Sequence, residues 1–167
     1  MHNQPLERAL ASKNKKIKTV MDNLENHDVQ ILFTEIDRHG DSVRFKDYSF
    51  QVNDSSYFYP ASTVKFPIAI LALEKMNTNA LIDKNTEFNI EGDSVKTTFS
   101  NDIKKIFAVS DNDAYNRLFE YLGTDYINQK LLEKGIHARI SHRLSVNNSG
   151  SLITKPLTFY NQNGIIL

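Results

Sequence analysis

The sequence contains no cysteine, and this absence excludes several kinds of chemistry. Disulfides, cysteine-ligated zinc, iron–sulfur clusters and thiol nucleophiles all require the residue that is missing. Long apolar runs are also absent, whereas a membrane-spanning helix needs about 20 apolar residues in succession. The chain has no net charge, because 20 Lys and Arg balance 20 Asp and Glu, so no overall basic field attracts nucleic acid. We therefore expect no membrane span and no nucleic-acid partner.

Acidic residues are missing from the C-terminal part of the chain, where Glu133 is the last one. Residues 134–167 therefore offer no carboxylate as a catalytic base. The N-terminus lacks the pattern of a secretory signal, in which a basic start precedes an apolar stretch. A cytoplasmic protein is expected if Met1 is the native start.

The length of 167 residues and the composition, 40% hydrophobic and 24% charged, are ordinary for one soluble globular domain. Apolar spacing predicts a helix over 5–27, and the stretches 29–36 and 42–51 predict an antiparallel hairpin of half-buried strands. A hairpin is marginal alone, so the sheet is expected to be incomplete. From residue 62 the sequence predicts an almost entirely apolar helix, which we expect to be buried on all sides. An irregular stretch over 77–100 should follow, and then helices over 101–109, 113–122 and 125–134 and a final loop region. Gly123 and Gly135 are expected to end the last two helices, and Thr124 to cap the final one.

The segment Ser62-Thr63-Val64-Lys65 is the first candidate for chemistry. Positions i and i+3 share a face of a helix, so the Ser62 hydroxyl and the Lys65 amine can meet. A serine hydroxyl needs a base to become nucleophilic, and an amine beside the following apolar helix could have the lowered pKa of such a base. Ser12-Lys13-Asn14-Lys15 has the same S-x-x-K spacing, but its lysine-rich helix face is solvated and offers nothing to desolvate an amine.

The tripeptide Ser110-Asp111-Asn112 is the second candidate, and it lies between two predicted helices. All three residue types are good helix caps, so a purely structural role is a plain alternative. Both candidates lie at predicted helix starts. Together, S-x-x-K followed by S-D-N is typical of class A β-lactamases and penicillin-binding proteins.

On these motifs the chain resembles the serine β-lactamase and penicillin-binding protein superfamily over roughly residues 6–150. The resemblance implies an α+β, β-lactamase/transpeptidase-like fold, with a mostly helical subdomain and an incomplete antiparallel sheet. It implies one truncated serine hydrolase domain over 1–167. Its parts are a helix and two strands over 5–52, a helical part with both motifs over 53–150, and a loop-like tail over 151–167.

The resemblance also assigns roles to residues. Ser62 is the expected nucleophile, with its backbone N–H as half of the oxyanion hole, and Lys65 is the amine that activates it. Ser110 is expected to pass a proton to the leaving group. Asn112 is expected to bind the substrate amide and brace Lys65, while Asp111 holds the loop. No metal or cofactor is implied.

Two elements of the family pattern are missing. No K-T-G or K-S-G follows Ser110, although that motif supplies a carboxylate-binding site and lies on the strand with the second oxyanion donor. The deacylating glutamate of class A β-lactamases is also absent, because its loop here reads RISHRLSVNNSG, with His142 as the only candidate base. The unpaired hairpin and the missing wall of the site lead us to expect that these 167 residues are poorly active alone.

The resemblance implies acylation of Ser62 by a small β-lactam, a D-Ala-D-Ala-like peptide or an ester. A catalytically incomplete sensor domain that binds such molecules is the alternative, and a helical interaction domain without a site is a third hypothesis. By resemblance, the location is periplasmic or extracellular. The sequence leaves the oligomeric state open.

Overall fold

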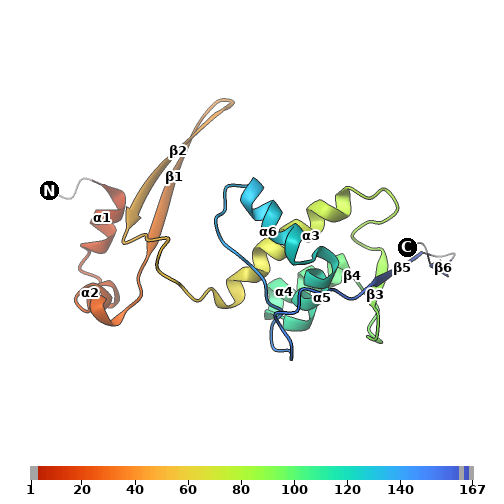
Figure 1. Cartoon of the computed structure of the whole chain (residues 1–167). Coiled ribbons are helices and arrows are strands. Elements are labelled where there is room, and N and C mark those ends of the chain that lie inside the picture. The colour runs from red at the N-terminus through yellow and green to blue at the C-terminus, as the bar shows by residue number, and fades with distance from the viewer. Residues whose placement is uncertain (1–3, 162–163, 166–167) are drawn as a thin grey trace. The chain divides into compact units, whose positions relative to one another are not determined.

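The computed structural model describes residues 4–161 and 164–165. The chain forms two compact units, residues 1–59 and residues 60–167. The described residues contain six α-helices, two short 3₁₀ helices and two antiparallel sheets (Figure 1), which confirms the α+β class and the mostly helical part with an incomplete sheet.

The N-terminal unit begins with two short helices rather than one. α1 (Pro5–Leu10) and α2 (Lys15–Met21) are followed by a 3₁₀ turn, η1 (Leu24–Asn26), so the predicted continuous helix over 5–27 is wrong. Asn14 is the reason for the break, because its side-chain oxygen accepts hydrogen bonds from the backbone N–H groups of Lys16 at 2.9 Å and Ile17 at 3.4 Å. An asparagine that caps a new helix starts that helix at its own position.

The predicted hairpin is confirmed. β1 (Ile31–His39) pairs with β2 (Ser42–Phe50) antiparallel, and the tight turn between them contains Gly40 at φ 58°. The expected half-burial is wrong, however, because most of both strands is exposed, including Leu32 at 63% and Phe45 at 67%. Among the described residues no third strand joins this sheet.

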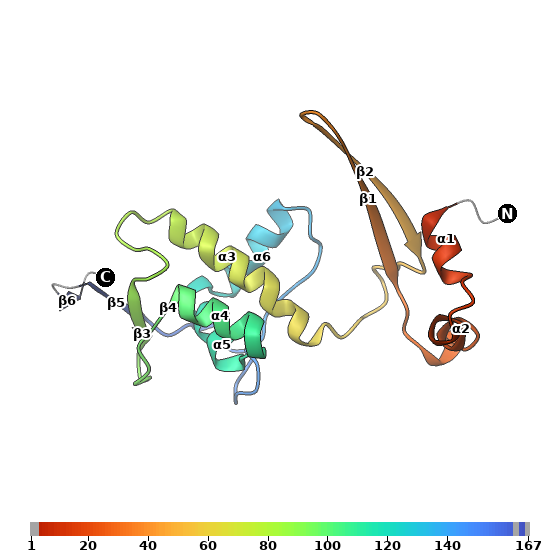
Figure 2. The same cartoon turned by 180° about the vertical axis from the view of Figure 1, so that it is seen from behind.

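The C-terminal unit is built around α3 (Lys65–Asn77), which follows the 3₁₀ turn η2 (Ala61–Val64). Figure 1 and Figure 2 show α3 alongside α4 (Phe99–Val109) and α5 (Asn112–Leu122), and it also contacts α6 (Thr124–Glu133). The core of the unit includes Ile68, Leu71, Ala72, Ile106, Leu118 and Ile127.

The expectation that α3 is buried on every side is wrong. Phe66 is 60% exposed and Ile70 is 39% exposed, because α4, α5 and α6 cover only part of the helix. An apolar sequence therefore does not by itself show that every face of a helix has a partner.

The three later helices agree with the predicted ranges to within two residues, and glycines end two of them. Gly123 follows α5 at φ 78° and Gly135 lies just beyond α6 at φ 74°, conformations that favour glycine. The capping role expected of Thr124 is wrong. Gly123 is the N-cap of α6, and the buried Thr124 hydroxyl has no hydrogen-bond partner among the residues that the structure describes.

A second sheet was not predicted. β3 (Glu87–Ile90) and β4 (Thr97–Thr98) lie in the stretch expected to be irregular, and β5 (Leu157–Asn161) and β6 (Gly164–Ile165) lie in the tail expected to be loop-like. The order is β4-β3-β5-β6, and every pairing is antiparallel. Aromatic packing attaches the sheet to the helices: the Phe88 ring lies 5.7 Å from Phe159 and 4.9 Å from Phe99.

Candidate active site

Ser62 and Lys65 lie at the entrance to α3. Ser62 is in the 3₁₀ turn η2, and Lys65 is the first residue of the α-helix that continues from it. The backbone N–H of Lys65 donates to the carbonyl of Ser62, which is the i to i+3 bond of that turn. The Ser62 side chain is exposed and its hydroxyl has no hydrogen bond within the described part of the chain. The two side chains thus lie near each other in sequence without a hydrogen bond between them.

The S-D-N tripeptide forms the turn between α4 and α5. Ser110 is the C-cap of α4 in a left-handed conformation, with φ 55° and ψ 43°. Asp111 is the N-cap of α5, and its carboxylate accepts a hydrogen bond from the backbone N–H of Ala114 at 2.8 Å. That bond lowers the pKa of Asp111, because it stabilises the charged form. Asp111 therefore contributes to the turn, and Asn112 begins α5 beside it.

The amine of Lys65 joins the two motifs. Its Nζ donates to Ser110 Oγ at 2.9 Å, to Asn112 Oδ1 at 2.6 Å and to the carbonyl oxygen of Ser110. The residue is only 3% exposed, so these three oxygens replace the water that the amine would otherwise bind. The structure thus brings together three of the four residues predicted for the site.

Two opposing effects act on the protonation of Lys65. Burial lowers its pKa below the usual 10.5, and the nearby Asp111 carboxylate partly opposes that shift. Three hydrogen bonds to oxygen account for all three N–H donors of an ammonium group. When the Lys65 ammonium loses one proton, its two remaining N–H groups can still donate to the Ser110 carbonyl and to Asn112 Oδ1. The lone pair of the neutral amine can then accept a proton from a hydroxyl.

A buried ion pair holds α4 and α5 on either side of the S-D-N turn. The guanidinium of Arg117 donates to the Asp102 carboxylate twice, at 2.9 and 2.8 Å, and Asp102 also accepts from the Thr97 hydroxyl at 2.9 Å. Asp102 has no exposed surface. This pairing raises the pKa of Arg117 and links the two helices that flank the turn.

The loop that contains His142, the one candidate base of this region, also reaches the site. Tyr115 Oη donates to the backbone carbonyl of His142 at 2.9 Å, and the Asn116 side chain bonds to both the N–H and the carbonyl of Leu144. These bonds bring Ser145 to Asn112, whose Nδ2 donates to Ser145 Oγ at 2.8 Å. The imidazole of His142 is hydrogen-bonded to Ser141 at 2.9 Å, which gives no support to the hypothesis that it is a base.

The sequence did not indicate Ser145. It is one of several small polar residues in a loop, and 33 positions separate it from Asn112. No local pattern distinguishes it from its neighbours, so only the tertiary contact reveals it.

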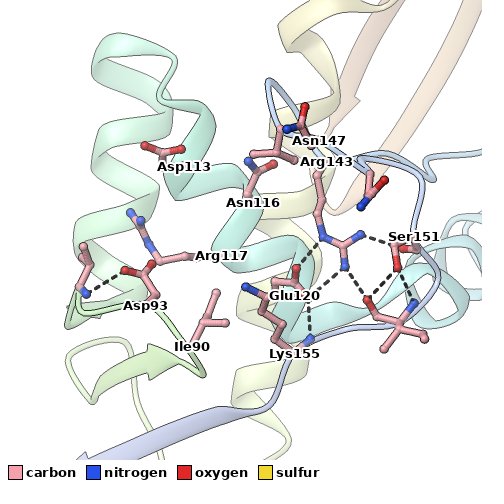
Figure 3. Close-up of a pocket in the computed structure, with 14 residues that line it drawn as sticks. Ile90, Asp93, Asp113, Asn116, Arg117, Glu120, Arg143, Asn147, Ser151 and Lys155 are labelled. Carbon is pink, nitrogen blue, oxygen red and sulfur yellow. Dashed lines mark hydrogen bonds and ion pairs between the residues drawn. The ribbon is translucent and has the colours of Figure 1, made fainter.

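A cavity in the C-terminal unit lies apart from Ser62 and Lys65. It has a volume of about 590 Å³, and Figure 3 shows α5 and the loop around it, with Asp113, Arg117 and Lys155 in its wall. Arg143 forms an ion pair with Glu120 at 2.6 Å at this cavity and donates to two carbonyls of the loop. We identify the candidate active site by its hydrogen-bond network, since the cavity contains none of the motif residues.

Among the described residues, no three His, Asp or Glu side chains are grouped in a way that could hold a metal ion. No helix within the described ranges has the length and apolar character needed to cross a membrane.

No curated protein and no solved structure matches the chain. A family model described as the beta-lactamase enzyme family matches residues 12–155, a span that includes S-x-x-K, S-D-N and the loop of Ser145. Because this match covers most of the sequence, the chain belongs to the beta-lactamase enzyme family, whose members act on small-molecule substrates.

Proposed function

We propose that this protein is a serine hydrolase of the β-lactamase or D,D-peptidase type that is acylated on Ser62. One observation carries the proposal: the Lys65 amine is buried within hydrogen-bonding distance of both Ser110 and Asn112. The family match supports the reaction class, and the network supports the assignment of roles. The natural location is proposed to be extracytoplasmic, as for the enzymes that the motifs resemble.

The proposed reaction begins with neutral Lys65. Its Nζ accepts the proton of the Ser62 hydroxyl as the Oγ attacks the substrate carbonyl, and the backbone N–H of Ser62 stabilises the developing oxyanion. The carbonyl–nitrogen or carbonyl–oxygen bond then breaks. Ser110, hydrogen-bonded to Lys65, relays the proton to the leaving atom, and Asn112 Nδ2 lies on the side of the network where it can orient the substrate.

The substrate is proposed to be a β-lactam, a D-Ala-D-Ala-like peptide or an ester. The alternative is a sensor-like domain that is acylated and releases no product. We expect slow hydrolysis of the acyl-enzyme, because the loop residue that contacts Asn112 is the neutral Ser145 and not a carboxylate.

The first prediction concerns the nucleophile. A fluorophosphonate or penicillin should label Ser62 and no other serine, because only Ser62 is followed by a buried lysine of the network. Peptide mapping by mass spectrometry measures the site. Ser62→Ala should abolish labelling, and Ser12→Ala should leave it unchanged because Ser12 belongs to the exposed S-x-x-K copy. Label on a different serine would contradict the proposal.

The second prediction concerns turnover. Penicillin should give a burst of about one equivalent per active site and then little further hydrolysis, because the loop RISHRLSVNNSG that reaches the site contains no acidic residue to activate water. Rapid-mixing absorbance measurements separate the burst from the steady state. Sustained multiple turnover at the burst rate would show that another group activates water.

A further inference from the structure

Ser145 is held in a backbone conformation that serine disfavours. Its φ is +56°, in the left-handed region that glycine and asparagine tolerate best. The residue just before it, Leu144, is fixed by two hydrogen bonds to the Asn116 side chain, at 2.9 and 2.7 Å. The loop is thus bonded to α5 immediately beside Ser145, which keeps its hydroxyl at Asn112.

The side-chain amide of Asn112 has an oxygen that accepts hydrogen bonds and a nitrogen that donates them. Its Oδ1 accepts from the Lys65 amine at 2.6 Å, and its Nδ2 donates to Ser145 Oγ at 2.8 Å. If the amide were rotated by 180°, its N–H donors would face the N–H donors of Lys65, and that arrangement is repulsive. The Lys65 amine, which has only donors, therefore sets this orientation, and the Ser145 hydroxyl, which accepts from Nδ2, holds the other end of the amide in place.

We infer that Ser145 is a positioning residue that holds the Asn112 amide so that Oδ1 faces Lys65 and Nδ2 lies on the side proposed to meet the substrate. This inference rests on the proposed function of the site. It adds a residue from a distant loop to the two motifs, and that residue acts on Lys65 through Asn112 without touching it.

The test removes the hydroxyl in two ways. Ser145→Ala removes the oxygen that accepts from Asn112, and Ser145→Gly does the same while suiting the positive φ, so the loop keeps its backbone. In both variants the amide loses its anchor at Nδ2, so Oδ1 is held less firmly against Lys65 and stabilises the ammonium form less. The pKa of Lys65 should therefore fall in both variants. The rate of Ser62 labelling at its high-pH plateau should fall about fivefold to tenfold, the scale of one ordinary hydrogen bond.

Two variants serve as controls. Ser145→Asn keeps an oxygen acceptor in a residue that tolerates the left-handed conformation, so it should restore the wild-type pH profile. Ser149→Ala removes a hydroxyl from the same loop with no bond to Asn112, so it should leave the profile unchanged. The Asp111 carboxylate, which raises the pKa of Lys65, is retained in all four variants.

The pKa of Lys65 is measured directly, from the NMR shift of its Cε as a function of pH, and this readout does not depend on labelling. An unchanged titration in both Ser145→Ala and Ser145→Gly would overturn the inference. Failure of wild-type Ser62 to react would contradict the proposed function, whereas the NMR titration would still decide the role of Ser145.

Discussion

Replacing Lys65 by alanine should reduce the rate at which Ser62 is acylated by about 10²–10⁴-fold, the usual contribution of a general base. The reason is that Lys65 carries the buried amine bonded to Ser110 and Asn112, and no other lysine in the described part of the chain has these partners. Stopped-flow or quenched labelling with a fluorophosphonate measures the rate constant.

The acylation rate should also rise with pH. Only the neutral amine can accept a proton, and burial lowers the pKa of Lys65, so the midpoint of the rise should lie below 10.5. Lys15→Ala changes the lysine of the exposed S-x-x-K copy and is the matched control for the loss of a positive charge. A Lys65→Ala variant that reacts at the wild-type rate would rule out Lys65 as the base.

Replacing Asp102 by alanine should lower the free energy of unfolding by about 3–5 kcal/mol, because it leaves the buried Arg117 charge without its partner. Asp102 is fully buried and makes hydrogen bonds to both Arg117 and Thr97. Urea unfolding followed by circular dichroism gives the difference. Asp113→Ala, at an exposed position in the first turn of α5, is the control and should change stability much less.

The double variant Asp102→Leu, Arg117→Met distinguishes an unpaired charge from a loss of packing. Replacement of both members of a buried pair by apolar residues is often nearly neutral, so most of the lost stability should return. If the double variant is as unstable as Asp102→Ala, the pair contributes through packing or geometry and not through charge compensation.

Local signals predicted the helical part of the fold well. The glycines at positions 123 and 135 both take positive φ angles and mark helix ends, and the hairpin was recognised from two apolar stretches around a turn that contains Gly40. The break near Asn14 was missed, because apolar spacing continued through a residue whose side chain starts a new helix.

Non-local pairing accounts for the larger errors. β3 has only four residues, and its burial comes from β5, whose Phe159 pairs with Phe88 from a segment 71 positions away. Neither strand has enough alternating apolar residues to be recognised alone. The same limitation applies to the site: both motifs were visible in the sequence, whereas Ser145 required knowledge of how its loop is bonded to α5.

The bond from Lys65 to the carbonyl of Ser110 has a consequence for α4 as well as for the site. Ser110 is the C-cap of that helix, where backbone carbonyls lack intrahelical donors and the helix dipole is negative. The Lys65 ammonium is therefore a cation supplied by a different helix that stabilises the end of α4. Each time the amine gives up its proton to become a base, the C-terminus of α4 loses that positive charge. The neutral amine that activates the nucleophile therefore stabilises the last turn of α4 less than the ammonium does.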